Sequence, residues 1–83
     1  MPKFMDVHTI DGGVEATDIA ELHAKDLAHQ ANHGVQFLKY WVDEKAGKVF
    51  CLSEAPDAEA SLSVHREAHG AMPEEIFEVG EFS

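Results

Sequence analysis

Residues 35–53 read VQFLKYWVDEKAGKVFCLS, and this stretch decides the fold. Val35 to Val42 is rich in aromatic and β-branched residues, which favours a strand. Asp43 to Gly47 has the composition of a hairpin loop, and Lys48 to Ser53 is the partner strand. Because both faces of this hairpin are partly apolar, we expect its sheet to be covered on both. Helices of this chain would cover one face, and a second copy of the chain the other.

Helical patterns lie on both sides of the hairpin. A helix is predicted over residues 17–33, with Thr17 as its N-cap and Gly34 as its stop. A second helix is predicted over residues 56–69, with Pro56 in its first turn and a glycine after its end.

Two further strands complete the pattern, at Lys3–Thr9 and at Ile76–Phe82. The order βαββαβ with right-handed crossovers predicts an α+β fold, the ferredoxin-like sandwich. That fold is a four-stranded antiparallel sheet with two helices on one face, and it occupies residues 1–83 as a single domain. We expect the first and third strands as central, parallel neighbours in this otherwise antiparallel sheet. The two helices are expected side by side, running in the same direction.

Charge and composition exclude several classes of function. The formal net charge of −10 repels nucleic acid and anionic membrane, and it suits cationic partners such as metal ions. Cys51 is the only cysteine, so no intrachain disulfide and no zinc-finger spacing exist. The N-terminus lacks an apolar signal core and no run is long enough to span a membrane, so we expect a cytoplasmic protein.

The six histidines are the main functional signal. Helical periodicity puts His23 at the centre of the inward face of the first helix, with Asp26 and Gln30 beside it. That face contains Ile19, Leu22, His23 and Leu27. The inward face of the second helix contains Ala58, Ser61, Leu62, His65 and Ala68, with His69 on its flank. Imidazoles at the centre of a small apolar core need partners that satisfy them.

These positions form a candidate metal site. If both helices lie over the central strands, we expect His23 and His65 to approach each other. Asp6 or His8 then lies beneath them if their face of the first strand points to the helices. His65 and His69 are four residues apart and share one helical face, a usual spacing for two ligands of one metal. Imidazole and carboxylate ligands favour Ni, Zn, Cu or Fe over Mg or Ca. The alternative is that the histidines are hydrogen-bonded structural residues.

Other side chains stay open as ligands: Asp26, Cys51, Glu54, His29 and His33. His29 and His33 are interpreted as surface residues, and Cys51 as a small apolar core residue. The templates for enzymes mostly fail, since there is no glycine-rich phosphate loop and no nucleophile elbow. A Cys51–His65 dyad or an acid–base pair of Asp6 and His8 remains conceivable.

The chain also resembles a known family over nearly its whole length. The stretches that carry the resemblance are PKFMDVH (2–8), GV (34–35), CLSEAP (51–56), HREAHG (65–70), Pro73 and EV (78–79). The family consists of small bacterial proteins that bind nickel and otherwise form a domain of unknown function. The resemblance implies a ferredoxin-like fold, a dimer through the sheet, and nickel binding that depends on Asp6, His8 and His65.

The leading hypothesis is therefore a protein that sequesters, buffers or senses nickel, with Zn or Cu as other metals of the same class. Its expected ligands are Asp6, His8, His23, His65 and His69. A second hypothesis is a small dimeric enzyme with a pocket lined by Tyr40, Cys51 and His65. A third is a structural accessory domain whose histidines satisfy one another.

Overall fold

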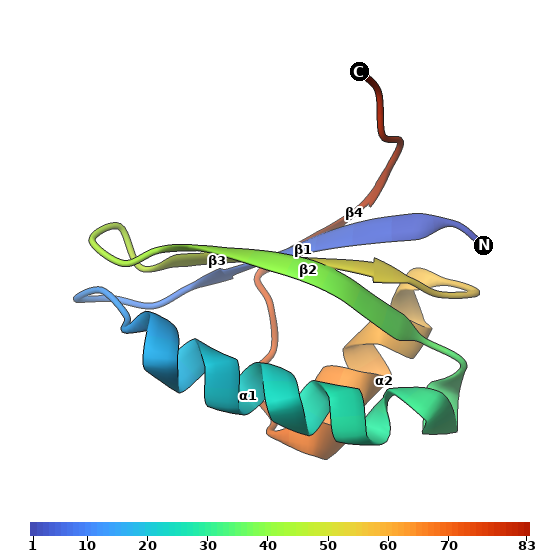
Figure 1. Ribbon diagram of the computed structural model, residues 1–83, viewed down its shortest axis with the longest axis horizontal. Coiled ribbons are helices and arrows are strands. Elements are labelled where there is room, and N and C mark those ends of the chain that lie inside the picture. The colour runs from blue at the N-terminus through green and yellow to red at the C-terminus, as the bar shows by residue number, and fades with distance from the viewer.

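A computed structural model describes residues 1–83 and contains one four-stranded sheet with two α-helices on one face (Figure 1). The elements are β1 (Lys3–Thr9), α1 (Ala16–His29), the 3-10 helix η1 (Gln30–His33), β2 (Gln36–Asp43), β3 (Lys48–Glu54), α2 (Ala58–Ala68) and β4 (Glu75–Val79). The strand order is β2-β3-β1-β4, and every neighbouring pair is antiparallel. The predicted ferredoxin-like βαββαβ fold is confirmed.

Two expectations about direction are wrong. β1 and β3 are central neighbours, but they pair antiparallel, with Asp6 opposite Cys51. The helices also run in opposite directions (Figure 1). The direction of the helices follows from that of the strands. Each helix runs antiparallel to the strand that precedes it, and those strands, β1 and β3, are antiparallel to each other.

The ends of the elements differ in part from the sequence prediction. α1 begins at Ala16, so Thr17 is not its N-cap; the Ala16 N–H instead donates to the Glu44 carboxylate at 2.9 Å. α2 begins after Pro56, with Asp57 as the N-cap that accepts from the Ala60 N–H at 2.8 Å. η1 extends α1 to His33, and Gly34 ends it with a left-handed φ of 67°.

The last strand is shorter than predicted and ends at Val79 instead of Phe82. β4 pairs only with β1, and the first residue of β1, Lys3, already faces Val79. The residues after Val79 have no ladder partner, and the Phe82 side chain is 93% exposed.

The core lies between the helices and the sheet. It consists of Phe4, Ile19, Val35, Phe37, Val49, Cys51, Ala55 and Val64. The buried line of α1 runs through Ile19 and Asp26, so the expectation that Leu27 faces inward is wrong, and Leu27 is 43% exposed. Leu27 is one residue beyond Asp26, and one residue turns a helix by about 100°. Asp26 thus occupies the core position.

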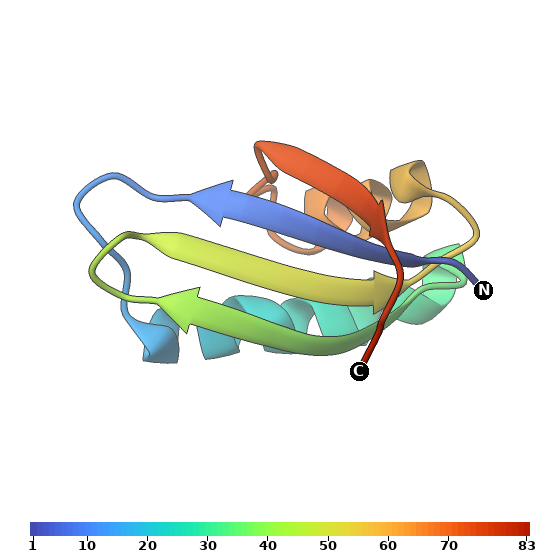
Figure 2. The ribbon, with the colours of Figure 1, turned by 90° about the horizontal axis from the view of Figure 1, so that it is seen from above.

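No helix covers the opposite face of the sheet, and only the C-terminal segment after β4 crosses it, as Figure 2 shows. Trp41 and Phe77 on the sheet are 47% and 48% exposed. No helix of the structure is both long and apolar enough to cross a membrane.

Candidate metal centre

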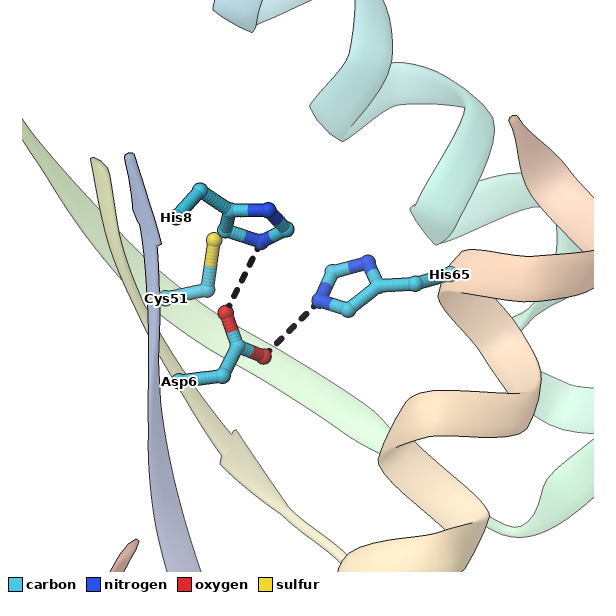
Figure 3. A group of neighbouring side chains, drawn as sticks. All are labelled: Asp6, His8, Cys51 and His65. Carbon is cyan, nitrogen blue, oxygen red and sulfur yellow. Dashed lines mark hydrogen bonds and ion pairs between the residues drawn. The ribbon is translucent and has the colours of Figure 1, made fainter. Parts of the chain in front are cut away.

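A buried carboxylate lies at the centre of the sheet. Phe4, Asp6 and His8 alternate on the face of β1 that the helices cover, and Asp6 is fully buried opposite Cys51 of β3. A carboxylate in this position needs a compensating charge or hydrogen bonds. Figure 3 shows that its two oxygens point toward different histidines, His8 from the same strand and His65 from α2.

His65 is held between two carboxylates. Its Nε2 lies 2.8 Å from Oδ2 of Asp6, and its Nδ1 lies 2.9 Å from Oδ1 of Asp26 on α1. The imidazole is 1% exposed, so burial opposes its charge. The hydrogen bonds and negative charges of Asp26 and Asp6 outweigh burial and raise the pKa of His65 to about 9. In the metal-free protein His65 is therefore an imidazolium that donates to both carboxylates.

The second oxygen of Asp6 has no hydrogen-bond partner. Oδ1 lies 3.0 Å from Nε2 of His8, but the approach lacks the angles of a hydrogen bond, and the atom is buried. Burial raises the pKa of Asp6, but His65 and His8 outweigh it and hold the pKa below its usual value. A buried carboxylate oxygen that has an imidazole nitrogen beside it but receives no hydrogen bond is a natural ligand for a cation.

Four side chains meet around this oxygen. Ligand atoms of Asp6, His8, Cys51 and His65 all lie within 4.8 Å of one another. Burial, together with the charges of Asp6 and Asp26, raises the pKa of the Cys51 thiol, so the thiol is protonated without a metal. The set of one carboxylate, two imidazoles and one thiol suits a transition metal and does not suit Mg or Ca.

Asp26 and His69 form the outer side of this cluster. Nε2 of His69 lies 3.0 Å from Oδ1 of Asp26, and Nδ1 of His69 accepts the Ala71 N–H at 3.0 Å. Because Nδ1 accepts this backbone N–H, the proton of a neutral His69 ring lies on Nε2, the nitrogen that faces Asp26. Burial lowers the pKa of His69 even though Asp26 raises it, which keeps the ring neutral. Asp26, His65 and His69 also have ligand atoms within 4.8 Å of one another. We call these residues the carboxylate–histidine cluster: Asp6, His8, Asp26, His65 and His69.

The remaining sequence candidates lie elsewhere. His23 is half-buried and outside both groups of ligand atoms, and its ring stands 4.5 Å from that of Tyr40. His29 donates from Nδ1 to the Lys25 carbonyl, and His33 pairs with Glu67 at 2.7 Å near the surface. Glu54 ends β3 opposite Lys3 and is outside both groups.

The sequence analysis named Asp26 only as an alternative, although it is a central member of the cluster. The available signal was its spacing of seven residues from Ile19, which places both side chains on one line of the helix. Leu27 was predicted to face inward instead, because it is apolar and Asp26 is charged. The pocket expected near Tyr40, Cys51 and His65 corresponds to a cavity of about 190 Å³ that all three residues line.

Comparisons with known proteins show the family and the fold of the chain. A family model described as "Nickel responsive protein SCO4226-like" matches residues 4–79. The crystal structure of SCO4226 from Streptomyces coelicolor A3(2) superposes with a TM-score of 0.89. It is 38% identical to this chain, and the match covers 98% of this chain and 99% of that one. No curated protein matches. The predicted resemblance is confirmed, and the chain belongs to the SCO4226-like family of nickel responsive proteins.

Proposed function

We propose that the protein binds a nickel ion in its core and serves to sequester, buffer or sense that metal. The single observation that carries the proposal is Oδ1 of Asp6, a buried carboxylate oxygen that lies beside His8 and receives no hydrogen bond. Two imidazoles and a thiol have ligand atoms within reach of the same point. The name of the family supports nickel as the metal, and Zn or Cu would suit the same ligands.

In this proposal the metal has four protein ligands: Asp6, His8, His65 and Cys51. His65 gives up the Nε2 proton that it now donates to Asp6 and keeps Nδ1–H on Asp26. A carboxylate behind a ligating imidazole fixes its orientation and makes it a better ligand. His69 acts through Asp26, since its Nδ1 is already occupied by the Ala71 N–H. His23 belongs to neither group of neighbouring ligand atoms. It lines the cavity beside the site, and we propose that it lies on the route by which the metal enters.

The experiment is nickel titration calorimetry on the untagged, metal-free protein. Asp6→Asn keeps the shape of the side chain and removes its charge, and it should weaken nickel binding at least tenfold, or about 1.4 kcal/mol. Asp18→Asn, at an exposed position of α1, is the matched control and should change nothing. His29→Gln and His33→Gln test whether surface imidazoles contribute. Unchanged affinity in Asp6→Asn, or equal binding of Ca and Ni, contradicts the proposal.

An enzymatic function remains the alternative because the cavity lies beside Cys51 and His65. Two observations favour binding over catalysis. The raised pKa of Cys51 makes it a poor nucleophile at neutral pH. Both ring nitrogens of His65 are engaged by carboxylates, so no nitrogen is free to accept a proton from a substrate.

We also propose that the protein is a cytoplasmic homodimer that pairs through the open face of the sheet. The support is the exposure of Trp41 and Phe77 on a face that no helix of this chain covers. Trp41→Glu should convert the dimer to a monomer in sedimentation velocity, because it places a charge in an apolar interface. Leu27→Glu, at an exposed position of α1, should leave the dimer intact. A wild-type monomer at micromolar concentration contradicts this proposal.

A further inference from the structure

The 190 Å³ cavity lies beside the carboxylate–histidine cluster, between α1, the sheet and the segment that follows α2. Met72, which is 39% exposed, lies at its rim. The cavity therefore connects buried polar groups with solvent. An apolar cavity of about 150 Å³ is large enough to hold benzene, so this cavity has room for one six-membered ring.

The walls and the inner end of the cavity differ in chemistry. Its apolar walls include Ile10, Ile19, Leu22, Val49 and Met72. Its buried polar end is formed by Asp26, His65 and His69. Tyr40 and His23, with ring centroids 4.5 Å apart, add aromatic surface. A ligand that fits must be hydrophobic along its body and polar at one end.

One acceptor at the polar end is free. Oδ1 of Asp26 is the oxygen that pairs with both His65 and His69, at 2.9 and 3.0 Å. Oδ2 of Asp26 receives no hydrogen bond from the protein, although the residue is only 3% exposed and lines the cavity. Since Oδ2 of Asp26 is not among the fully buried unpaired atoms, it keeps access to solvent and can accept a hydrogen bond from a ligand in the cavity.

The charge around this oxygen selects the sign of the ligand. Two carboxylates, those of Asp6 and Asp26, flank the single imidazole of His65 at this end, and the second oxygen of Asp26 receives no hydrogen bond from the protein. The formal net charge of the chain is −10, which adds to this bias. A cation is therefore favoured over an anion of the same size.

We propose that the cavity binds a small organic cation, a single hydrophobic ring that bears a primary ammonium group donating to Oδ2 of Asp26. The ring lies among the apolar walls, and the ammonium group replaces water at the only free oxygen of Asp26. This site goes beyond the proposed nickel site and does not use Asp6, His8 or Cys51 as ligands. The two sites adjoin through the contact between His65 and Asp26, so the variant that separates them is at Leu22, which lines the cavity and belongs to neither set of metal ligands.

The first test uses the wild-type, metal-free chain labelled with ¹⁵N and titrated with benzylamine. Saturable shifts with a Kd of about 1 mM or below are expected for a ligand of this size. They should map to the amides of Leu22, His23, Val49 and Met72. Benzoate, which has a similar size and the opposite charge, should not bind. No saturation by about 10 mM benzylamine, equal binding of benzoate, or shifts confined to Trp41 and Phe77 overturns the proposal.

The second test uses variants whose fold is first checked by their amide spectra. Leu22→Trp fills the cavity and should abolish benzylamine binding, whereas Leu27→Trp on the exposed side of α1 should not. Asp26→Asn should weaken benzylamine at least tenfold and leave benzyl alcohol, the neutral analogue, unchanged. Equal loss for both ligands in Asp26→Asn overturns the role of the carboxylate.

Nickel titration of the Leu22→Trp variant separates the two proposals. This variant should bind nickel as the wild type does, since Leu22 is not among the proposed ligands. Benzylamine binding without nickel binding in the wild type would leave the cavity proposal standing and overturn the nickel site. Nickel binding without benzylamine binding would do the reverse.

Discussion

Raising the pH from 6.5 to 9 should destabilise the metal-free protein. The pKa of His65 is about 9 in the folded chain and 6.5 in the unfolded chain. Between these two pH values the folded state therefore holds one proton more than the unfolded state. A raised pKa gives stability that is complete below pH 6.5 and is lost as the pH rises through 9. The loss amounts to about 1.4 kcal/mol per pH unit, or about 3 kcal/mol over the whole window. Urea melts at half-unit intervals measure it directly.

Nickel binding should depend on pH in the opposite sense over the same window. The proposed metal displaces the Nε2 proton of His65, so the apparent affinity rises about tenfold for each pH unit up to about 9. If the Cys51 thiol also loses its proton to the metal, the slope of log K against pH becomes about two instead of one. Calorimetry at several pH values therefore counts the protons released and decides whether Cys51 is a ligand.

The control for both effects is Asp26→Asn, which removes one of the two carboxylates that raise the pKa of His65. Its window of falling stability should end at a lower pH, and an NMR titration of the His65 ring should report the same shift. Stability that stays flat between pH 6.5 and 9 in the wild type would refute the reasoning. So would a nickel affinity that does not change with pH.

Three further predictions follow from the same contacts. His65→Ala leaves Asp6 and Asp26 buried without the imidazolium between them, so urea melts at pH 7 should show a loss of about 3–5 kcal/mol in the metal-free protein; a loss below about 1 kcal/mol would contradict the charged-pair description. Acidification should also destabilise the fold below pH 3.8, because the lowered pKa of Asp6 gives stability that is present above pH 3.8 and is lost as the pH falls through the folded pKa. Circular dichroism at pH 2–5 compares the acid unfolding of the wild type with that of Asp6→Asn. Identical transitions in the two proteins would refute this role of Asp6. Gly47→Ala should lower the melting temperature clearly more than Gly12→Ala does. Both glycines have positive φ, but a Cβ at Gly47 would clash with the Ile10 carbonyl, whereas one at Gly12 would contact nothing. An equal fall in melting temperature would exclude the steric cause.

The expectation for His65 changes once the structure is known. From sequence, an unsatisfied imidazole that serves as a ligand could be removed without harm to the metal-free fold. The structure shows an imidazole satisfied on both sides, so removal exposes two carboxylates to each other in the core. A structural role and a ligand role are therefore compatible in His65.

The aromatic and β-branched residues of Val35 to Val42 and the loop composition of residues 43–47 were sufficient to predict the hairpin, and the helical periodicities predicted both helices. Asp6 and His8 could be assigned to one face of their strand because side chains alternate with a period of two. Strand ends were harder to predict. β4 stops at Val79 because β1 offers no partner beyond Lys3, which is a property of the pairing and not of residues 80–82.

The sequence by itself determined the order of the elements, the residues of β1 that share one face, and the presence of His65 in the core, but it did not predict that Val64 of α2 is buried. Only the tertiary structure decided that Asp26 replaces Leu27 inside and that His23 stands apart from the cluster. Only the tertiary structure also decided that His65 lies between the carboxylates of Asp6 and Asp26, which are 20 residues apart in the chain. Local periodicity fixes the side of an element to within about one residue, or 100° on a helix. Which of two adjacent residues enters the core then depends on the partner it finds there, and for Asp26 that partner is 39 residues away in His65.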